Sequence, residues 1–308
     1  AYEIPKRDWS SDVCSSDLYS SDQAHSSVEK SAMALGLGRV GWGKVSSDAA
    51  FRMDVRALEA AIERDRKDGF TPFAVVATVG TTSTTSVDPV PAIADVCARY
   101  GLWLHIDAAY AGSAAILPEL RHTLDGCERA DSFVMNPHKW LLTPMDCSAF
   151  YCRRPEMLRK AFSLSREYLK TPENDGINQM DSSLQLGRRF RALKLWMVIR
   201  HYGVSGLQAI VREHIRLAQL FASFVESDER FELAAPAPFS TVCFRLKSGN
   251  AENQALMDRV NAAGRTFISA TELGGKVTLR FAIGNGRSAE THVRAAWDEI
   301  RKIGRAHV

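Results

Sequence analysis

Three short apolar runs in the middle of the chain each lead into polar residues that can do chemistry. The runs 74–79, 102–106 and 133–135 are followed by a pair of threonines, by Asp107 and by Lys139. Apolar runs of this length are typical of buried strands in a parallel sheet. In such a sheet the carboxyl ends of the strands share one edge, where ligands bind. The sequence therefore predicts a lysine, an aspartate and hydroxyl groups at one edge of a sheet.

Lys139 is the most informative of these residues because its neighbours are apolar. It lies in NPHKW, between the run 133–135 and two leucines. Burial disfavours the charged ammonium form and lowers the pKa of a lysine, which gives the neutral amine that condenses with an aldehyde. The alternative is a lysine that extends from a strand end to water. We expect the first, with Lys139 in dry surroundings.

Together, the polar groups match the requirements of pyridoxal phosphate (PLP). This cofactor needs a lysine for its aldehyde, a carboxylate opposite its ring nitrogen and short polar groups for its other oxygens. A carboxylate such as Asp107 favours the protonated ring nitrogen, because a nearby opposite charge stabilises the charged form. The predicted cofactor is therefore PLP, bound at Lys139 and Asp107.

Five sequence motifs resemble, in the same order, those of the group II PLP-dependent decarboxylases, and within that group those of the aromatic-L-amino-acid decarboxylases. The motifs are SDQAHSS (21–27), VGTT (79–82), HIDAAYAGSA (105–114), NPHKWLL (136–142) and LGRRFRALKLW (186–196). The resemblance covers residues 19–302. It implies the α/β fold type I of PLP enzymes, with a largely parallel sheet sandwiched by helices and a smaller C-terminal α/β domain. It also implies a homodimer that converts an L-amino acid, aromatic by these motifs, to the amine and carbon dioxide.

The same resemblance gives roles to individual residues. His25 would stack on the pyridoxal ring and face the substrate carboxylate. Tyr168, in a turn-rich stretch, would protonate the substrate carbon after carbon dioxide has left. The other residues that would contact the cofactor, the last two at its phosphate, are Thr82, Ala109, Asn136 and His138.

Both ends of the chain have an unusual sequence. Residues 8–18 read DWSSDVCSSDL and residues 303–308 read IGRAHV, which match the translation of a sequencing-library adapter and of its reverse complement. We therefore expect residues 1–18 and 303–308 to be adapter-derived. Residues 19–193 would then be the remainder of a large cofactor-binding domain, and 194–302 a bridging helix and a small domain. On this interpretation an N-terminal arm and the first part of the large domain would precede Tyr19.

Composition and charge argue against several other classes of protein. The chain is 45% hydrophobic and 24% charged, which is ordinary for a globular enzyme. Its net charge of +3 is spread along the sequence, which predicts neither a nucleic-acid nor a membrane partner. The five cysteines after residue 18 form no CxxC pair, so we expect free thiols in the cytoplasm and neither disulfides nor a metal site.

Further helices and strands follow from periodicity and from capping residues. A short helix is expected after His25, begun by Ser26 or Ser27 and ended by Gly36. Longer helices are expected at 51–68, 89–100, 188–202, 207–226, 253–263 and 289–302, and further strands at 148–152, 241–246 and 277–283.

Three alternatives for the function remain open at this stage. Aldehyde synthases of the same family consume oxygen and differ at the loop tyrosine and the ring-stacking histidine, so Tyr168 and His25 favour plain decarboxylation. A second alternative is a non-aromatic substrate such as glutamate. The third is an inactive fragment, because part of the site would lie in the sequence before Tyr19.

Overall fold

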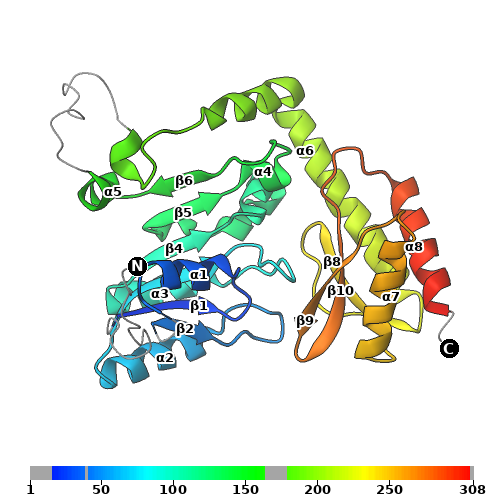
Figure 1. Ribbon diagram of the computed structural model, residues 1–308, viewed down its shortest axis with the longest axis horizontal. Helices are drawn as coiled ribbons and strands as arrows, with labels where there is room; N and C mark the ends of the chain where they lie inside the picture. The colour runs from blue at the N-terminus through cyan, green and yellow to red at the C-terminus, as the bar shows by residue number, and fades with distance from the viewer. Residues whose placement is uncertain (1–15, 39–40, 164–178, 306–308) are drawn as a thin grey trace, which may run out of the picture.

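In the computed structural model, a six-stranded sheet and a four-stranded sheet are joined by the long helix α6 (Arg191–Glu226) (Figure 1). The structure describes residues 16–38, 41–163 and 179–305. The elements before α6 are β1 (Ser16–Ser21), α1 (Ser27–Ala34), β2 (Trp42–Val45), α2 (Val55–Lys67), β3 (Thr71–Thr78), α3 (Val90–Tyr100), β4 (Trp103–Asp107), the 3₁₀ helices η1 (Ala111–Ile116), η2 (Pro118–Leu124) and η3 (Cys127–Arg129), β5 (Ser132–Met135), α4 (Pro137–Trp140), β6 (Ala149–Cys152), α5 (Pro155–Phe162) and η5 (Gln179–Ser182). Those after it are β7 (Phe231–Leu233), β8 (Thr241–Leu246), α7 (Asn250–Ala262), β9 (Ser269–Leu273), β10 (Lys276–Ala282) and α8 (Glu290–Arg305).

The large sheet is mostly parallel, as the sequence predicts. Its strand order is β2-β1-β3-β4-β5-β6, and only β6 runs antiparallel to its neighbour. The register pairs Thr78 of β3 with Asp107 of β4, and Asp107 in turn with Val134 of β5. The carboxyl ends of these three strands therefore lie side by side at one edge of the sheet.

Helices cover both faces of this sheet, which explains why β3 is apolar throughout. Val75 and Ala77 belong to the main core with α2 and α3, whereas Ala74 and Val76 pack on the other face beside α1. Successive side chains of a strand point to opposite faces. Asp107 of β4 therefore shares a face with α1 and not with the main core.

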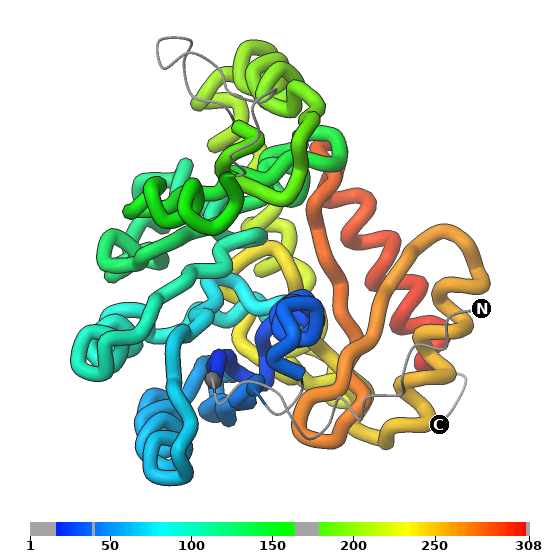
Figure 2. The backbone as a smooth tube through the Cα atoms, turned by 60° about the vertical axis from the view of Figure 1, so that its left-hand side comes forward, coloured from blue at the N-terminus to red at the C-terminus, as the bar shows by residue number. Residues whose placement is uncertain are grey.

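The smaller part of the molecule is built on an antiparallel sheet. Its order is β7-β8-β10-β9, and every neighbouring pair is antiparallel. Helices α7, α8 and the second half of α6 cover one face, and Phe221 and Trp297 meet edge to face in the core between them. The other face turns toward the large sheet (Figures 1 and 2), where Arg280 of β10 donates to the carbonyl oxygens of Thr82 and Ser83.

Two strands of the small sheet, β7 and β9, are not predicted from the sequence. β9 and β10 form a hairpin through Gly274 and Gly275, whose φ angles are 56° and 75°. Positive φ at both central residues is the type I′ turn, which glycine adopts without steric strain. The glycine pair is thus a hairpin signal, whereas β7 has only three residues and is too short to show a period.

Helix α6 consists of two helical segments that meet at a kink at Gly203, which agrees with the two helices joined at 203–206 that the sequence predicts. Gly203 has φ 64° and ψ 175°, which is not a helical conformation. All buried side chains of the helix follow this bend, and the residues before it leave Leu193, Trp196 and Met197 exposed. The second half of α6 therefore belongs to the core of the small part.

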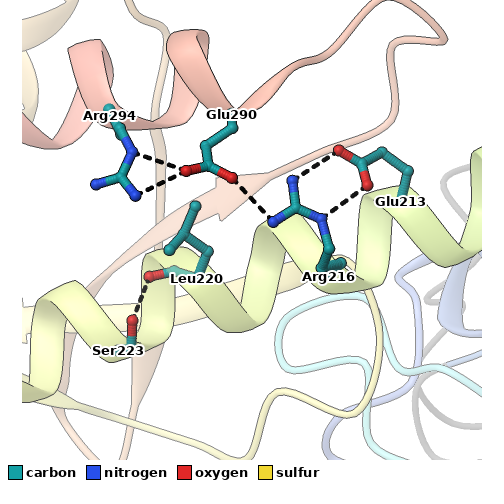
Figure 3. Close-up of polar contacts among 6 residues, drawn as sticks. All are labelled: Glu213, Arg216, Leu220, Ser223, Glu290 and Arg294. Atoms are coloured by element: carbon teal, nitrogen blue, oxygen red, sulfur yellow. Dashed lines mark hydrogen bonds and ion pairs between the residues drawn. The ribbon is translucent and has the colours of Figure 1, made fainter.

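A chain of ion pairs joins α6 to α8 on the outside of the small part. Arg216 lies between Glu213 and Glu290, and Glu290 also binds Arg294 (Figure 3). These side chains are exposed, and exposed ion pairs contribute little to stability. The aromatic core beneath them, and not this network, holds the two helices together.

Leu18 of β1 and Ile303 of α8 lie within the ranges that the sequence assigns to an adapter, and both pack against apolar clusters. Asp17 is different, because its side chain is 3% exposed and its Oδ2 has no hydrogen-bond partner in the part of the chain that the structure describes. Burial, with the nearby Asp65 carboxylate, raises the pKa of Asp17 from 3.8 to about 6.

This raised pKa predicts a pH-dependent loss of stability. Because the folded protein binds the Asp17 proton more tightly than the unfolded chain does, the contribution of Asp17 is complete below about pH 4 and is lost as the pH rises through about 6, at a cost of about 2 kcal/mol. Asp17→Asn is expected to remove this dependence. Urea unfolding at pH 4 to 7 measures it, with the exposed Asp95→Asn as the control. Equal slopes for wild type and Asp17→Asn would contradict the prediction.

Candidate functional site

Backbone hydrogen bonds continue the parallel sheet past the ends of its strands. The N–H of Val79 donates to the carbonyl oxygen of Asp107, and the N–H of Ala108 donates to that of Val134. The N–H of Asn136 then donates to the carbonyl oxygen of Ala109. The loops that carry the predicted site residues are therefore held in register with one another, and not only the strands that precede them.

Two cavities open at this edge of the sheet, with volumes of about 530 Å³ and about 260 Å³. Lys139 and Asp107 line both cavities, so the lysine and the carboxylate lie on one side of the sheet. The predicted residues that line the cavities are His25, Asp107, Ala109 and Lys139 in both, Asn136 in the larger and Thr82 in the smaller.

Lys139 is exposed, and the expectation of dry surroundings is wrong for this chain. It lies in α4, a single helical turn that follows β5. The next residue, Trp140, is 1% exposed and packs into the main core. Because consecutive residues of a helix point in different directions, Trp140 fills the core while Lys139 faces the cavity.

Asp107 is held in a fixed orientation at the end of β4. Its Oδ1 accepts a hydrogen bond of 3.0 Å from the backbone N–H of Ala109. The carboxylate is half-buried at the wall of both cavities. This position suits a carboxylate that pairs with a cationic ring nitrogen of a bound ligand.

His25 lies immediately before α1, as predicted, and its ring is oriented by the start of that helix. Nδ1 accepts the backbone N–H of Ser27 at 3.1 Å and lies 2.8 Å from the Ser27 hydroxyl. Ser26 occupies the cap position but forms no side-chain cap bond. Since a backbone N–H can only donate, we assign the proton of the neutral ring to Nε2.

Two predicted residues have no observed place at the cavities. His138 lines neither of them, and its Nδ1 lies 2.7 Å from the carbonyl oxygen of Cys147. Tyr168 lies outside the described residues. The roles expected for both side chains stay predictions.

The structure adds cavity residues that the sequence reasoning did not identify. His105 lines the larger cavity, and its Nδ1 lies 2.8 Å from the hydroxyl of Ser132. Burial lowers the pKa of His105, although the Asp107 carboxylate acts in the opposite direction. A period of two along β4 would have found His105, because it precedes Asp107 by two residues and shares its face. Arg280 of the smaller cavity comes from the other sheet, and local sequence carries no signal for it.

Unpartnered polar atoms around the cavities fit a polar ligand such as PLP. Among the described residues, Asn136 Oδ1 and the hydroxyls of Thr78 and Thr85 are buried without a hydrogen-bond partner. Such atoms are unfavourable unless something binds them. The two threonine hydroxyls and the amide NH2 of Asn136 can donate to phosphate or phenolate oxygens, whereas Asn136 Oδ1 can only accept a hydrogen bond. The Lys139 amine can react with an aldehyde, and the Asp107 carboxylate can pair with a pyridine nitrogen. The donor set therefore fits the predicted cofactor.

Other kinds of site find no support in the described ranges of the chain. No group of three His, Cys, Asp or Glu side chains there has the arrangement of a metal site. Over the same residues, no helix combines the length and the apolar character needed to span a membrane. Cys97, Cys127, Cys147, Cys152 and Cys243 are free thiols.

Gly80 lies in the turn that carries the cavity threonines, and the packing around it is close. Its φ is 87°, and an added Cβ would lie 2.6 Å from the Cβ of Ala111. Gly69 has a similar φ of 90° but open space around it. Gly80→Ala is expected to lower the free energy of unfolding by about 3 kcal/mol, and the control Gly69→Ala by about 1 kcal/mol. Urea unfolding of both variants measures the difference, and equal losses would show that the close packing at Gly80 is unimportant.

Known proteins are similar to this chain over most of its length. A family model described as the pyridoxal-dependent decarboxylase conserved domain matches residues 11–247. The aromatic-L-amino-acid decarboxylase of pig (Sus scrofa) is 47% identical over 288 residues, which are 92% of this chain and 59% of the pig protein. The chain thus spans about three fifths of the length of such relatives.

Solved structures show the same fold. The crystal structure of rice (Oryza sativa) TDC with PLP and tryptamine superimposes with a TM-score of 0.91 at 40% identity, covering 94% of this chain and 63% of the rice chain. The structure of Rhodiola rosea 4-hydroxyphenylacetaldehyde synthase gives a TM-score of 0.89 at 35% identity, covering 96% of this chain and 63% of the other.

Proposed function

Because the chain belongs to the family of pyridoxal-dependent decarboxylases, we propose that the protein it represents converts an aromatic L-amino acid to the corresponding amine and carbon dioxide. PLP, the cofactor predicted from the sequence, is the cofactor of this family. The observation that carries the proposal is that Lys139, Asp107 and His25 line one cavity beside the unpartnered oxygen of Asn136. The pig and rice relatives support an aromatic substrate.

Each of the proposed cavity residues would bind a different group of the cofactor. Lys139 offers the amine for its aldehyde, and Asp107 offers the negative charge that keeps a proton on its ring nitrogen. Thr82 and Asn136 offer hydrogen bonds to its oxygens, with His138 proposed beside them. When bound, PLP supplies an electron-accepting ring for the electron pair released as carbon dioxide leaves.

His25 and Tyr168 are proposed to act on the substrate itself. With Nδ1 of His25 occupied by the backbone of Ser27, the proton on Nε2 is the one that can donate to a substrate carboxylate. That hydrogen bond would orient the bond that breaks. Tyr168 is proposed to give a proton to the substrate carbon once carbon dioxide has left.

Substitution at the lysine and the aspartate tests these roles. Lys139→Ala is expected to abolish turnover and covalent cofactor binding. Asp107→Asn is expected to lower kcat by about 10² to 10³, because a preorganised charge is lost. The assays are amine production and the visible absorbance of the cofactor, with Lys44→Ala, an exposed lysine on β2, as the control. Normal absorbance and turnover in Lys139→Ala would refute the assignment.

Aldehyde synthesis is the main alternative to simple decarboxylation, and it is supported by the similarity to the Rhodiola rosea synthase. Tyr168 and His25 favour simple decarboxylation. We expect amine and carbon dioxide in equal amounts from an aromatic amino acid, without aldehyde or peroxide. Chromatography of the products with a peroxide assay separates the two reactions, and a panel that includes glutamate tests the non-aromatic alternative. Aldehyde formed together with peroxide would favour the rival.

A homodimer and a cytoplasmic location complete the proposal. The exposed apolar side chains Leu193, Trp196 and Met197 on the first half of α6 support a subunit interface, because monomers rarely expose such a cluster. The free thiols support a reducing compartment.

The third alternative, an inactive fragment, is tested together with assembly. PLP titration and sedimentation of the 308-residue chain should be compared with the same gene extended at its 5′ end. We expect dimerisation and tight cofactor binding in the extended protein, and weaker binding in the chain itself. A monomeric extended protein would contradict the proposed homodimer.

A further inference from the structure

We propose that His214, a buried residue of α6, is a positioning residue that sets the orientation of Lys139 through Trp140. His214 lines neither cavity, so it acts on the site only through other residues. The inference rests on the proposed role of Lys139 as the cofactor lysine.

Three residues from three parts of the fold form a continuous hydrogen-bonded chain. Trp140 of α4 donates its indole N–H to Nδ1 of His214 at 3.1 Å. Nε2 of His214 lies 3.0 Å from the carbonyl oxygen of Asn285, which follows β10 in the small part. Trp140 and His214 are each 1% exposed, so water does not compete for these bonds. The lysine helix is thus connected to the small sheet through α6.

Only the neutral ring of His214 satisfies both partners. The indole N–H of Trp140 can only donate, so Nδ1 must accept and Nε2 must carry the proton that the carbonyl of Asn285 accepts. Burial lowers the pKa of His214, which favours this neutral form. In this position the ring of His214 therefore accepts one hydrogen bond at Nδ1 and donates one at Nε2.

Lys139 needs such external support because its own helix is too short to be stable. α4 has four residues, and within it the N–H of Lys139 donates to the carbonyl oxygen of Asn136. Isolated helices of this length do not form in water. Trp140 anchors the turn by stacking on Tyr110, with ring centroids 4.8 Å apart, and by an edge contact to Phe239 at 5.8 Å. Rotation of Trp140 would therefore move the lysine beside it.

A second contact joins the same two segments. Gly286, next to Asn285, lies against Leu142 just beyond α4, and an added Cβ would be 3.3 Å from Cδ1 of that leucine. The hydroxyl of Tyr110, on which Trp140 stacks, lies 2.6 Å from the hydroxyl of Ser240 before β8. The small part therefore meets the surroundings of the lysine at several points, and His214 provides the contact that reaches Trp140 through hydrogen bonds.

Two substitutions at His214 separate hydrogen bonding from simple bulk. His214→Leu removes both hydrogen bonds, whereas His214→Gln retains one acceptor and one donor on a flexible side chain. Trp140→Phe keeps an aromatic ring and removes the indole donor together with part of the ring volume. His122→Leu, at an exposed histidine of η2, is the matched control. The experiment uses the 308-residue chain with PLP as the probe.

Two measurements are made on each variant. Hydrogen exchange followed by mass spectrometry reports the amide protons of Lys139 and Thr143, which are bonded within and just after α4. Borohydride reduction followed by peptide mapping reports how fast PLP is trapped on Lys139. In His214→Leu and Trp140→Phe we expect exchange to be about tenfold faster and trapping about tenfold slower. His214→Gln should restore both, and His122→Leu should change neither.

The outcomes are distinct. Unchanged exchange in both His214→Leu and Trp140→Phe would overturn the proposal, and so would faster exchange with wild-type trapping. Loss in His214→Gln equal to that in His214→Leu would show that bulk, not hydrogen bonding, matters at this position, which also overturns it. If the wild-type chain traps no PLP on Lys139, cofactor binding by this chain fails, while the exchange data still decide whether His214 holds α4.

Discussion

The parallel pairing of β3, β4 and β5 is the constraint on which the rest of the molecule depends. It places three carboxyl ends side by side, and the backbone hydrogen bonds beyond the strands keep the following loops in register. Asp107, Ala109 and Asn136 owe their positions to this ladder. A sheet slipped by one residue would turn Asp107 to the opposite face and into the apolar core.

The small antiparallel part contributes to the same site from the other side. Arg280 donates to the carbonyl oxygens of Thr82 and Ser83, and the Cys243 thiol also donates to Ser83. The outward carbonyl groups of the threonine turn are therefore satisfied from the other sheet. Ser83 is half-buried, and a backbone carbonyl group that is shielded from water is costly when left unpaired. A shift of the small part relative to the large sheet would therefore move the threonine turn and change the shape of the cavity.

How much of this could be predicted from the sequence depends on how local each signal is. The buried strands and their shared edge follow from apolar runs that need no distant information. The predicted site residues that line the cavities are His25, Thr82, Asp107, Ala109, Asn136 and Lys139. The exposure of Lys139 could not be predicted, because it depends on Trp140 filling a core built from remote segments. The positions of Arg280 and His214 likewise depend on tertiary contacts between the two parts, and no sequence motif predicts them.

The edge strand β6 of the large sheet affects how the protein associates in concentrated solution. β6 is the last strand, pairs only with β5 in the described part of the chain, and carries the exposed rings of Phe150 and Tyr151. Its outer row of backbone donors and acceptors is a template on which an extended segment of another molecule can add. Concentrated solutions of the chain would thus tend toward open-ended polymers through this rim, a route to precipitation separate from any closed dimer.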